Sequence, residues 1–199
     1  LFKLNINNFD TYLLSNYKNT FDFPIIIKPI HGCGSRGVVK IKNEKQLNIF
    51  KKKKINKKKY IVQKIIKGDE YTVSVILDKS SKDFQIIPKK IIKKKRFTRE
   101  AITEKNKLIS GICKKIIKNF KPGGPFNVQC IANKKNLEIF EINPRLSTSS
   151  TLTAASGINE INTLVKKHLN KKFSIKKLKW KSSVKLIRNK KDNFIYNSK

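Results

Sequence analysis

Residues 126–143 read FNVQCIANKKNLEIFEIN, which is two mostly apolar runs joined by a short polar turn. The apolar positions favour β-structure, so the stretch predicts two antiparallel strands that turn about Lys135. In that register Gln129 lies opposite Glu141, and Asn127 lies opposite Asn143. A shift by one residue would mix polar and apolar side chains, so the pattern itself specifies the register.

This predicted hairpin has one apolar face and one polar face. Gln129, Glu141 and Asn143 converge on the polar face as oxygen donors. Oxygen ligands without His or Cys suit Mg²⁺, which keeps several waters and usually binds substrate phosphates. A polar strand face that simply meets solvent has the same pattern, so the spacing alone leaves both interpretations open. The residues expected on the apolar face are Phe126, Val128, Cys130, Phe140 and Ile142.

A glycine-rich loop, HGCGSRG at residues 31–37, follows the apolar run FPIIIKPI at residues 23–30. The loop matches G-x-G-x-x-G, but the strand-like run VVKIK after it excludes the dinucleotide-binding unit, which needs a helix there. The pattern favours a β-turn-β flap whose backbone N–H groups approach phosphate oxygens closely. Lys28 stands in the apolar run and needs a partner. A structural carboxylate would serve, and the neighbouring loop favours phosphate.

The remaining periodicity predicts further strands and helices along the chain. Residues 93–103 have no clear pattern. The helix over 104–120 is expected to bury Leu108, Ile109, Ile112, Ile116, Ile117 and Phe120. Strands are expected at 23–30, 38–42, 60–66, 71–77, 84–92, 126–132, 137–143 and 183–187, and helices at 10–19, 44–53 (after the N-cap Asn43), 104–120 and 158–169.

The charge is extreme, because 47 basic residues against 13 acidic ones give a net charge of +34. A polyanion partner, either nucleic acid or an anionic membrane, is one interpretation. However, only five of the basic residues are Arg, and Lys, Ile and Asn crowd every row, which is typical of an AT-rich genome. We therefore expect no nucleic-acid partner. Three cysteines without a C-x-x-C pair and the lack of a long apolar run indicate a cytoplasmic protein without a membrane span.

Four features occur in a fixed order: Lys28 with its flap, VQKIIKGDEY at 62–71, Gln129, and EINPR at 141–145. Together they resemble the ATP-grasp superfamily, above all the ATP-grasp halves of carbamoyl-phosphate synthetase large chains and the shorter ligases similar to them. The resemblance implies an α+β fold of two antiparallel-sheet lobes with ATP between them. The lobes are expected at 1–66 and 67–171, followed by a basic extension at 172–199 that carries a closing strand.

The resemblance also implies which residues hold the nucleotide. Lys28 is expected to contact the phosphates and to act in catalysis, under a flap that offers backbone groups of Gly34, Ser35 and Gly37. Gln63 stands where many relatives have Glu, and an amide there still accepts from the adenine amino group.

The remaining implied roles fall on later motifs. Backbone groups of Lys64 and Ile66 are expected to meet the adenine edge, and Glu70 to hold the ribose hydroxyls. Gln129 and Glu141 are expected to bind Mg²⁺, or Mn²⁺ in its place, with Asn143 on a second ion. Arg145 is expected to face the transferred phosphoryl group and to act in catalysis.

The implied function is ATP-dependent ligation of a carboxylate or bicarbonate with an amine, through an acyl-phosphate. The family's upstream substrate-binding domain is not part of this sequence, so we expect a further domain or subunit to supply it. A non-catalytic nucleotide-binding domain and a basic module for RNA or membrane surfaces remain as alternatives. For Arg96, Arg99 and His31 a phosphate or substrate contact and a plain surface role both stay open.

Overall fold

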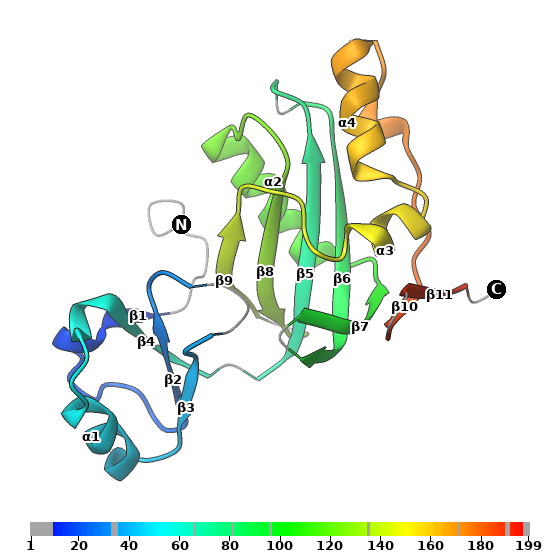
Figure 1. The fold of residues 1–199 in the computed structure, drawn as a ribbon. Coiled ribbons are helices and arrows are strands. Elements are labelled where there is room, and N and C mark those ends of the chain that lie inside the picture. The colour runs from blue at the N-terminus through cyan, green and yellow to red at the C-terminus, as the bar shows by residue number, and fades with distance from the viewer. Residues whose placement is uncertain are drawn as a thin grey trace. The chain divides into compact units, whose positions relative to one another are not determined.

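The computed structural model describes residues 10–32, 36–65, 67–80, 82–95, 97–134, 136–170, 172–189 and 192–196. The chain divides between Lys67 and Gly68 into two compact units. Each unit is built on an antiparallel sheet, and each carries helices (Figure 1). The predicted α+β class with two antiparallel sheets is therefore confirmed.

The first unit contains a four-stranded sheet and one α-helix. Helix α1 begins after Asn43, whose side chain accepts a hydrogen bond from the backbone N–H of Gln46, as predicted for an N-cap. Residues 10–19 do not form the predicted helix, because β1 and a 3-10 helix over Leu14–Asn16 occupy them. Across the sheet the strands are β1 (Thr11–Leu13), β4 (Tyr60–Lys64), β2 (Ile25–Pro29) and β3 (Val39–Ile41), and α1 spans Glu44–Lys52.

Alternation along β2 decides which face of the first sheet is buried. Ile25 and Ile27 are fully buried and pack with Val62, Leu47 and other apolar side chains into one core. Ile26 and Lys28 point to the opposite face, since successive side chains in a strand alternate. Lys28 is thus half-buried on the face that lies away from this core.

The second unit contains a seven-stranded sheet with helices on both faces (Figure 1). Strand β9 forms one edge, and β11 forms the other. The strands in order are β11 (Asp192–Tyr196), β10 (Val184–Arg188), β7 (Phe97–Thr103), β6 (Phe84–Lys95), β5 (Asp69–Leu77), β8 (Phe126–Ala132) and β9 (Leu137–Asn143), and the helices are α2 (Lys107–Phe120), α3 (Ser150–Ala155) and α4 (Glu160–Leu169).

Helix α2 covers one face of this sheet and closes its larger core. Ile109, Ile116 and Ile117 are buried there, as their spacing predicts. Two of the predicted core residues are not, since Leu108 is 41% exposed and Phe120 is 52% exposed. Cys113, which was not among the predicted core residues, is completely buried in the core.

The opposite face is covered in part by α3 and α4, over two smaller apolar clusters. The segment after α4 is held to the sheet by Asp83 and Gln85. Asp83 accepts hydrogen bonds from the backbone N–H groups of Ile175 and Lys176, at 2.8 and 2.7 Å. The Gln85 side-chain amide donates to the carbonyl oxygens of Ile175, Lys176 and Leu178. Residues 174–178 therefore belong to the folded second unit.

The predicted hairpin register is confirmed at the end of the hairpin that lies away from its turn. Gln129 pairs with Glu141, and Asn127 pairs with Asn143. The register shifts after Gln129, so that Cys130 pairs with Ile139 and Phe140 has no partner position. The core cluster accordingly takes Ile139 and excludes Phe140, so the prediction that Phe140 shares the apolar face was wrong.

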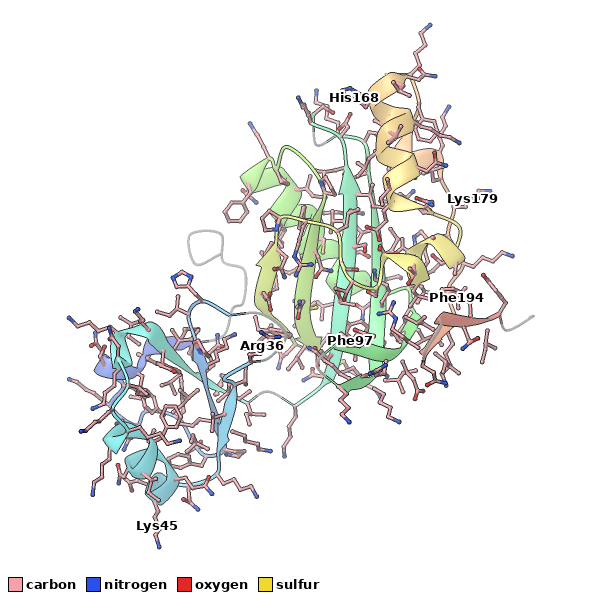
Figure 2. All side chains as sticks on the ribbon, in the orientation of Figure 1. Arg36, Lys45, Phe97, His168, Lys179 and Phe194 are labelled. Atoms are coloured by element: carbon pink, nitrogen blue, oxygen red, sulfur yellow. The ribbon has the colours of Figure 1, made fainter. Side chains whose placement is uncertain are left out.

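Lysine side chains project from the surfaces of both units, as Figure 2 shows for Lys45 and Lys179. Both residues are exposed. No helix within the described ranges combines the length and the apolar character that crossing a membrane would need.

Candidate functional site

Polar side chains form a row across four strands of the second sheet. Residues opposite each other in antiparallel strands share a face, and the register places Lys89, Thr72, Gln129 and Glu141 side by side in β6, β5, β8 and β9. The next row contains Ser74, Asn127 and Asn143. The three predicted metal ligands are thus on one face, at the edge that α3 and α4 leave open.

The outer end of these rows exposes oxygen donors. Glu141 is exposed, while Gln129 and Asn143 are half-buried. The Asn143 side-chain amide donates to the Glu141 Oε1 atom at 2.8 Å. This contact holds the two side chains together through the amide nitrogen of Asn143. The amide oxygen of Asn143 takes no part in it. One carboxylate with two amide oxygens is a donor set that fits Mg²⁺, whose remaining positions are commonly filled by water and phosphate.

Asn127 stabilises this edge of the sheet from the row that also contains Ser74 and Asn143. It is 2% exposed, and its amide nitrogen donates to Thr72 Oγ1 at 2.8 Å and to the Val73 carbonyl oxygen at 3.0 Å. These bonds connect β8 to β5 beside the row that contains Gln129. Asn127 is thus a supporting residue that the sequence placed in the hairpin without assigning it a role.

Glu70 lies one step further along β5, on the same face as Thr72. Its carboxylate forms an ion pair with the ammonium group of Lys94 in β6. Sequence reasoning did not find Lys94, because residues 93–103 have no clear periodicity. A ribose contact by Glu70 therefore has to share the carboxylate with this lysine.

Arg145 is the second residue of the segment 144–149, which joins β9 to α3. Its backbone N–H donates to the Asn143 carbonyl oxygen at 2.8 Å, and its guanidinium donates to the Leu146 carbonyl oxygen at 3.1 Å. The side chain is exposed. In Figure 1 this segment runs from β9 across the face of the sheet to α3. Arg145 thus lies two residues after the predicted metal ligand Asn143 in the chain.

A second basic feature lies at the β7 and β10 side of the same unit. A pocket of about 230 Å³ is lined by Lys93, Lys95, Arg99, Glu100, Arg188 and Asn189. The Arg99 guanidinium stacks over the Phe97 ring, 4.4 Å from its centroid, and Arg188 donates to the Thr148 carbonyl oxygen at 3.3 Å. Arg188 was recognised only as part of a closing strand. Arg96 lies outside the described residues.

In the first unit, the register places Lys28 opposite Ile61 and Gln63 opposite Ile26. Lys28 and Gln63 therefore share the sheet face that lies away from the core. Gln63 is buried, and its amide nitrogen donates to Thr11 Oγ1 at 2.8 Å. This bond fixes the amide, so that its oxygen is the group left to accept from an adenine amino group. Lys64, at the end of β4, lies 3.9 Å from the Asp10 carboxylate.

The described part of the flap explains one of its glycines. Gly37 has a φ of 73°, and a Cβ atom there would lie 2.9 Å from Pro29 Cγ. A side chain is excluded on both grounds, so this glycine has a structural reason that needs no phosphate. His31 is exposed, and His168 is exposed at the end of α4 (Figure 2). Gly34, Ser35 and Ile66 lie outside the described residues.

Comparison with known proteins gives a consistent result. A family model described as an ATP-grasp domain matches residues 9–149, which is well over half of the chain. A D-alanine--D-alanine ligase of Petrotoga mobilis is 28% identical in an alignment of 177 positions that covers 75% of this chain and 58% of the relative. The predicted resemblance to the ATP-grasp superfamily is thereby confirmed.

Solved structures show the same fold at low identity. The biotin carboxylase domain of Hydrogenobacter thermophilus 2-oxoglutarate carboxylase, solved with MgADP, ADP and bicarbonate, has a TM-score of 0.77 and 15% identity over 94% of this chain and 47% of its own. Carboxyaminoimidazole ribonucleotide synthase from Aspergillus clavatus, solved with ATP, has a TM-score of 0.74 and 13% identity over 94% of this chain and 53% of its own. The chain thus spans about half the length of these proteins.

Proposed function

The chain belongs to the ATP-grasp family, and from that premise we propose that it is the Mg·ATP-binding part of a ligase. The ligase joins a carboxylate or bicarbonate to an amine through an acyl-phosphate, with a further domain or subunit supplying the rest of the substrate site. The observation that carries this proposal is the polar edge of the second sheet, where Gln129, Glu141 and Asn143 lie in adjacent rows. Within the family, the motifs favour a ligase similar to carbamoyl-phosphate synthetase.

Each residue of the proposed site has a role that follows from the chemistry of its side chain or backbone. Gln129 and Glu141 hold Mg²⁺, and Asn143 holds a second ion or the same one. The metal, when bound, neutralises phosphate charge during phosphoryl transfer. Lys28 binds phosphate oxygens, and Arg145 binds the transferred group. Gln63 and backbone groups of Lys64 and Ile66 contact the adenine, Glu70 contacts the ribose, and backbone groups of Gly34, Ser35 and Gly37 cover the phosphates.

The basic pocket beside β7 and β10 supports an anionic acceptor. Two of its lining residues are Arg99 and Arg188, and arginine binds carboxylates through two parallel hydrogen bonds. Arg188 also contacts Thr148 in the segment that begins at Pro144 and Arg145. We therefore assign the acceptor carboxylate or bicarbonate to this pocket.

Nucleotide affinity measured by titration calorimetry, with and without Mg²⁺, tests the proposal. Hydrogen bonds to charged groups are worth about 1.5–3 kcal/mol, so Lys28→Ala should weaken ATP binding by about tenfold to a hundredfold. Glu141→Gln should lower the Mg²⁺-dependent affinity and leave the metal-free affinity nearly unchanged. Lys45→Ala and Glu44→Gln, on helix α1, are the matched controls. Equal affinities for Glu141→Gln and the parent protein would refute the metal site.

The net charge of +34 keeps a basic nucleic-acid-binding module as the second candidate. Salt separates the two functions. Affinity for nucleic acid falls steeply with salt, because binding releases many counterions. Mg·ATP binding at a few fixed contacts should fall much less between 50 and roughly 200 mM salt, the interval over which nucleic-acid affinity drops by orders of magnitude. Binding of nucleotide without ADP release on any offered acceptor would favour a non-catalytic domain.

A further inference from the structure

Lys89 in β6 is a lysine with no exposed surface. Its ammonium group donates hydrogen bonds to Ser74 Oγ at 2.7 Å, to Ser147 Oγ at 3.0 Å and to Thr153 Oγ1 at 3.0 Å. The Ser149 carbonyl oxygen lies 3.3 Å away as a further acceptor. The three N–H donors of the ammonium are therefore all matched by oxygen atoms.

The cluster contains one buried acid. Glu160, at the start of α4, is 2% exposed, and its Oε1 atom accepts from Ser74 Oγ at 2.7 Å. The same oxygen lies 3.9 Å from the Lys89 ammonium, so the two charges are paired directly and through the Ser74 hydroxyl. Burial lowers the pKa of Lys89 to about 8, and the charge of Glu160 opposes that change.

The cluster joins the sheet to the segment that follows the proposed metal ligands. Ser147 and Ser149 belong to the segment 144–149, in which Arg145 is the second residue. From another strand, Arg188 donates to the Thr148 carbonyl oxygen. The Lys89 ammonium in β6 and the Arg188 guanidinium in β10 thus bind three successive residues of this segment, 147–149. Lys89 also lies in the cross-strand row of Gln129 and Glu141.

We propose that Lys89 is a positioning residue of the nucleotide site: through Ser147 and Ser149 it fixes the segment 144–149 and so places Arg145 beside Asn143. This inference rests on the proposed function. A buried ion pair is often no more stabilising than apolar side chains of similar volume. A fully satisfied polar cluster instead defines one geometry for the groups that it bonds. In the segment 144–149 that geometry matters, because Lys89 and Arg188 bind it through the Ser147 hydroxyl and the carbonyl groups of Thr148 and Ser149.

A double substitution separates positioning from stability. Lys89→Met leaves Glu160 buried without its cation, so this variant should unfold at a lower urea concentration than the parent. Lys89→Met with Glu160→Leu removes both charges and should recover most of that loss. Lys90→Met is the control, because Lys90 lies next in β6 with an exposed ion pair to Asp69.

The affinity for Mg·ATP and the amide hydrogen exchange of residues 145–149 are measured in each variant. We expect the double variant to bind Mg·ATP at least about tenfold more weakly and to exchange the 145–149 amides at least about tenfold faster, while helix α2 exchanges as in the parent. Parent-like affinity and exchange in the double variant would overturn the inference. If the parent itself does not bind Mg·ATP, the proposed function fails, and hydrogen exchange alone decides whether Lys89 fixes the segment.

Discussion

The free energy of unfolding of this protein should increase as the pH rises from about 8 to about 10.5, because the buried ammonium group of Lys89 loses its proton. Burial lowers the pKa of Lys89 from 10.5 to about 8, partly opposed by Glu160. The difference of roughly 2.5 pKa units corresponds to about 3 kcal/mol, at 1.36 kcal/mol for each unit. The groups that face Lys89 from β5, from residues 147–149 and from α3 are hydroxyls and a carbonyl, so Glu160 is the charged group that contacts it.

The direction follows from proton binding in the two states. In the unfolded chain Lys89 keeps its proton up to its ordinary pKa, whereas in the folded protein it loses the proton near pH 8. Between these values the unfolded state binds more protons, so the free energy of unfolding increases with pH. Below about pH 8 the folded state carries the whole cost of the buried charge, and above about pH 10.5 that cost has disappeared.

Urea denaturation at several pH values between 7 and 10.5 measures this effect as a difference between two proteins. The parent should gain up to about 3 kcal/mol relative to Lys89→Met across that range, because all other lysines titrate in both. For Lys90→Met the difference should stay constant to about pH 10.5, since the hydrogen bond to Asp69 raises the pKa of Lys90. A parent-minus-Lys89→Met difference that does not change with pH would refute the reasoning.

Three other substitutions or modifications test the second unit. Gly68→Ala should destabilise by about 1–3 kcal/mol in urea denaturation, because its Cβ would lie 2.7 Å from the Ala132 carbonyl oxygen, whereas Gly123→Ala, with nothing within 4 Å, should change little. Asp83→Asn should cost about 2–4 kcal/mol at pH 7, since it weakens two hydrogen bonds from backbone N–H groups and the ion pair with Lys167. Burial raises the pKa of Cys113 and of Cys130, so peptide mass spectrometry should find both thiols unalkylated until the protein unfolds.

Several features of this structure could be predicted from local patterns in the sequence. The hairpin register at Gln129 and Glu141 could be predicted because side chains in a strand alternate, and only one alignment keeps the apolar side chains together. The N-cap at Asn43 is an equally local signal. The order of the motifs also predicted the family through their resemblance to the ATP-grasp superfamily, which the family model confirms.

Other features depended on packing between distant segments. The bulge at Phe140 arises from a shift in strand pairing, which no periodicity within 137–143 reveals. Strand β7 pairs with its neighbours β6 and β10, although residues 93–103 have no clear pattern that predicts a strand. The cluster around Lys89 is the clearest case, because a lysine within a basic run looks like a solvated surface residue. Only the tertiary structure brings Ser74, Ser147, Thr153 and Glu160 to it, and the cost of burying an ammonium group is met by partners that are far away in sequence.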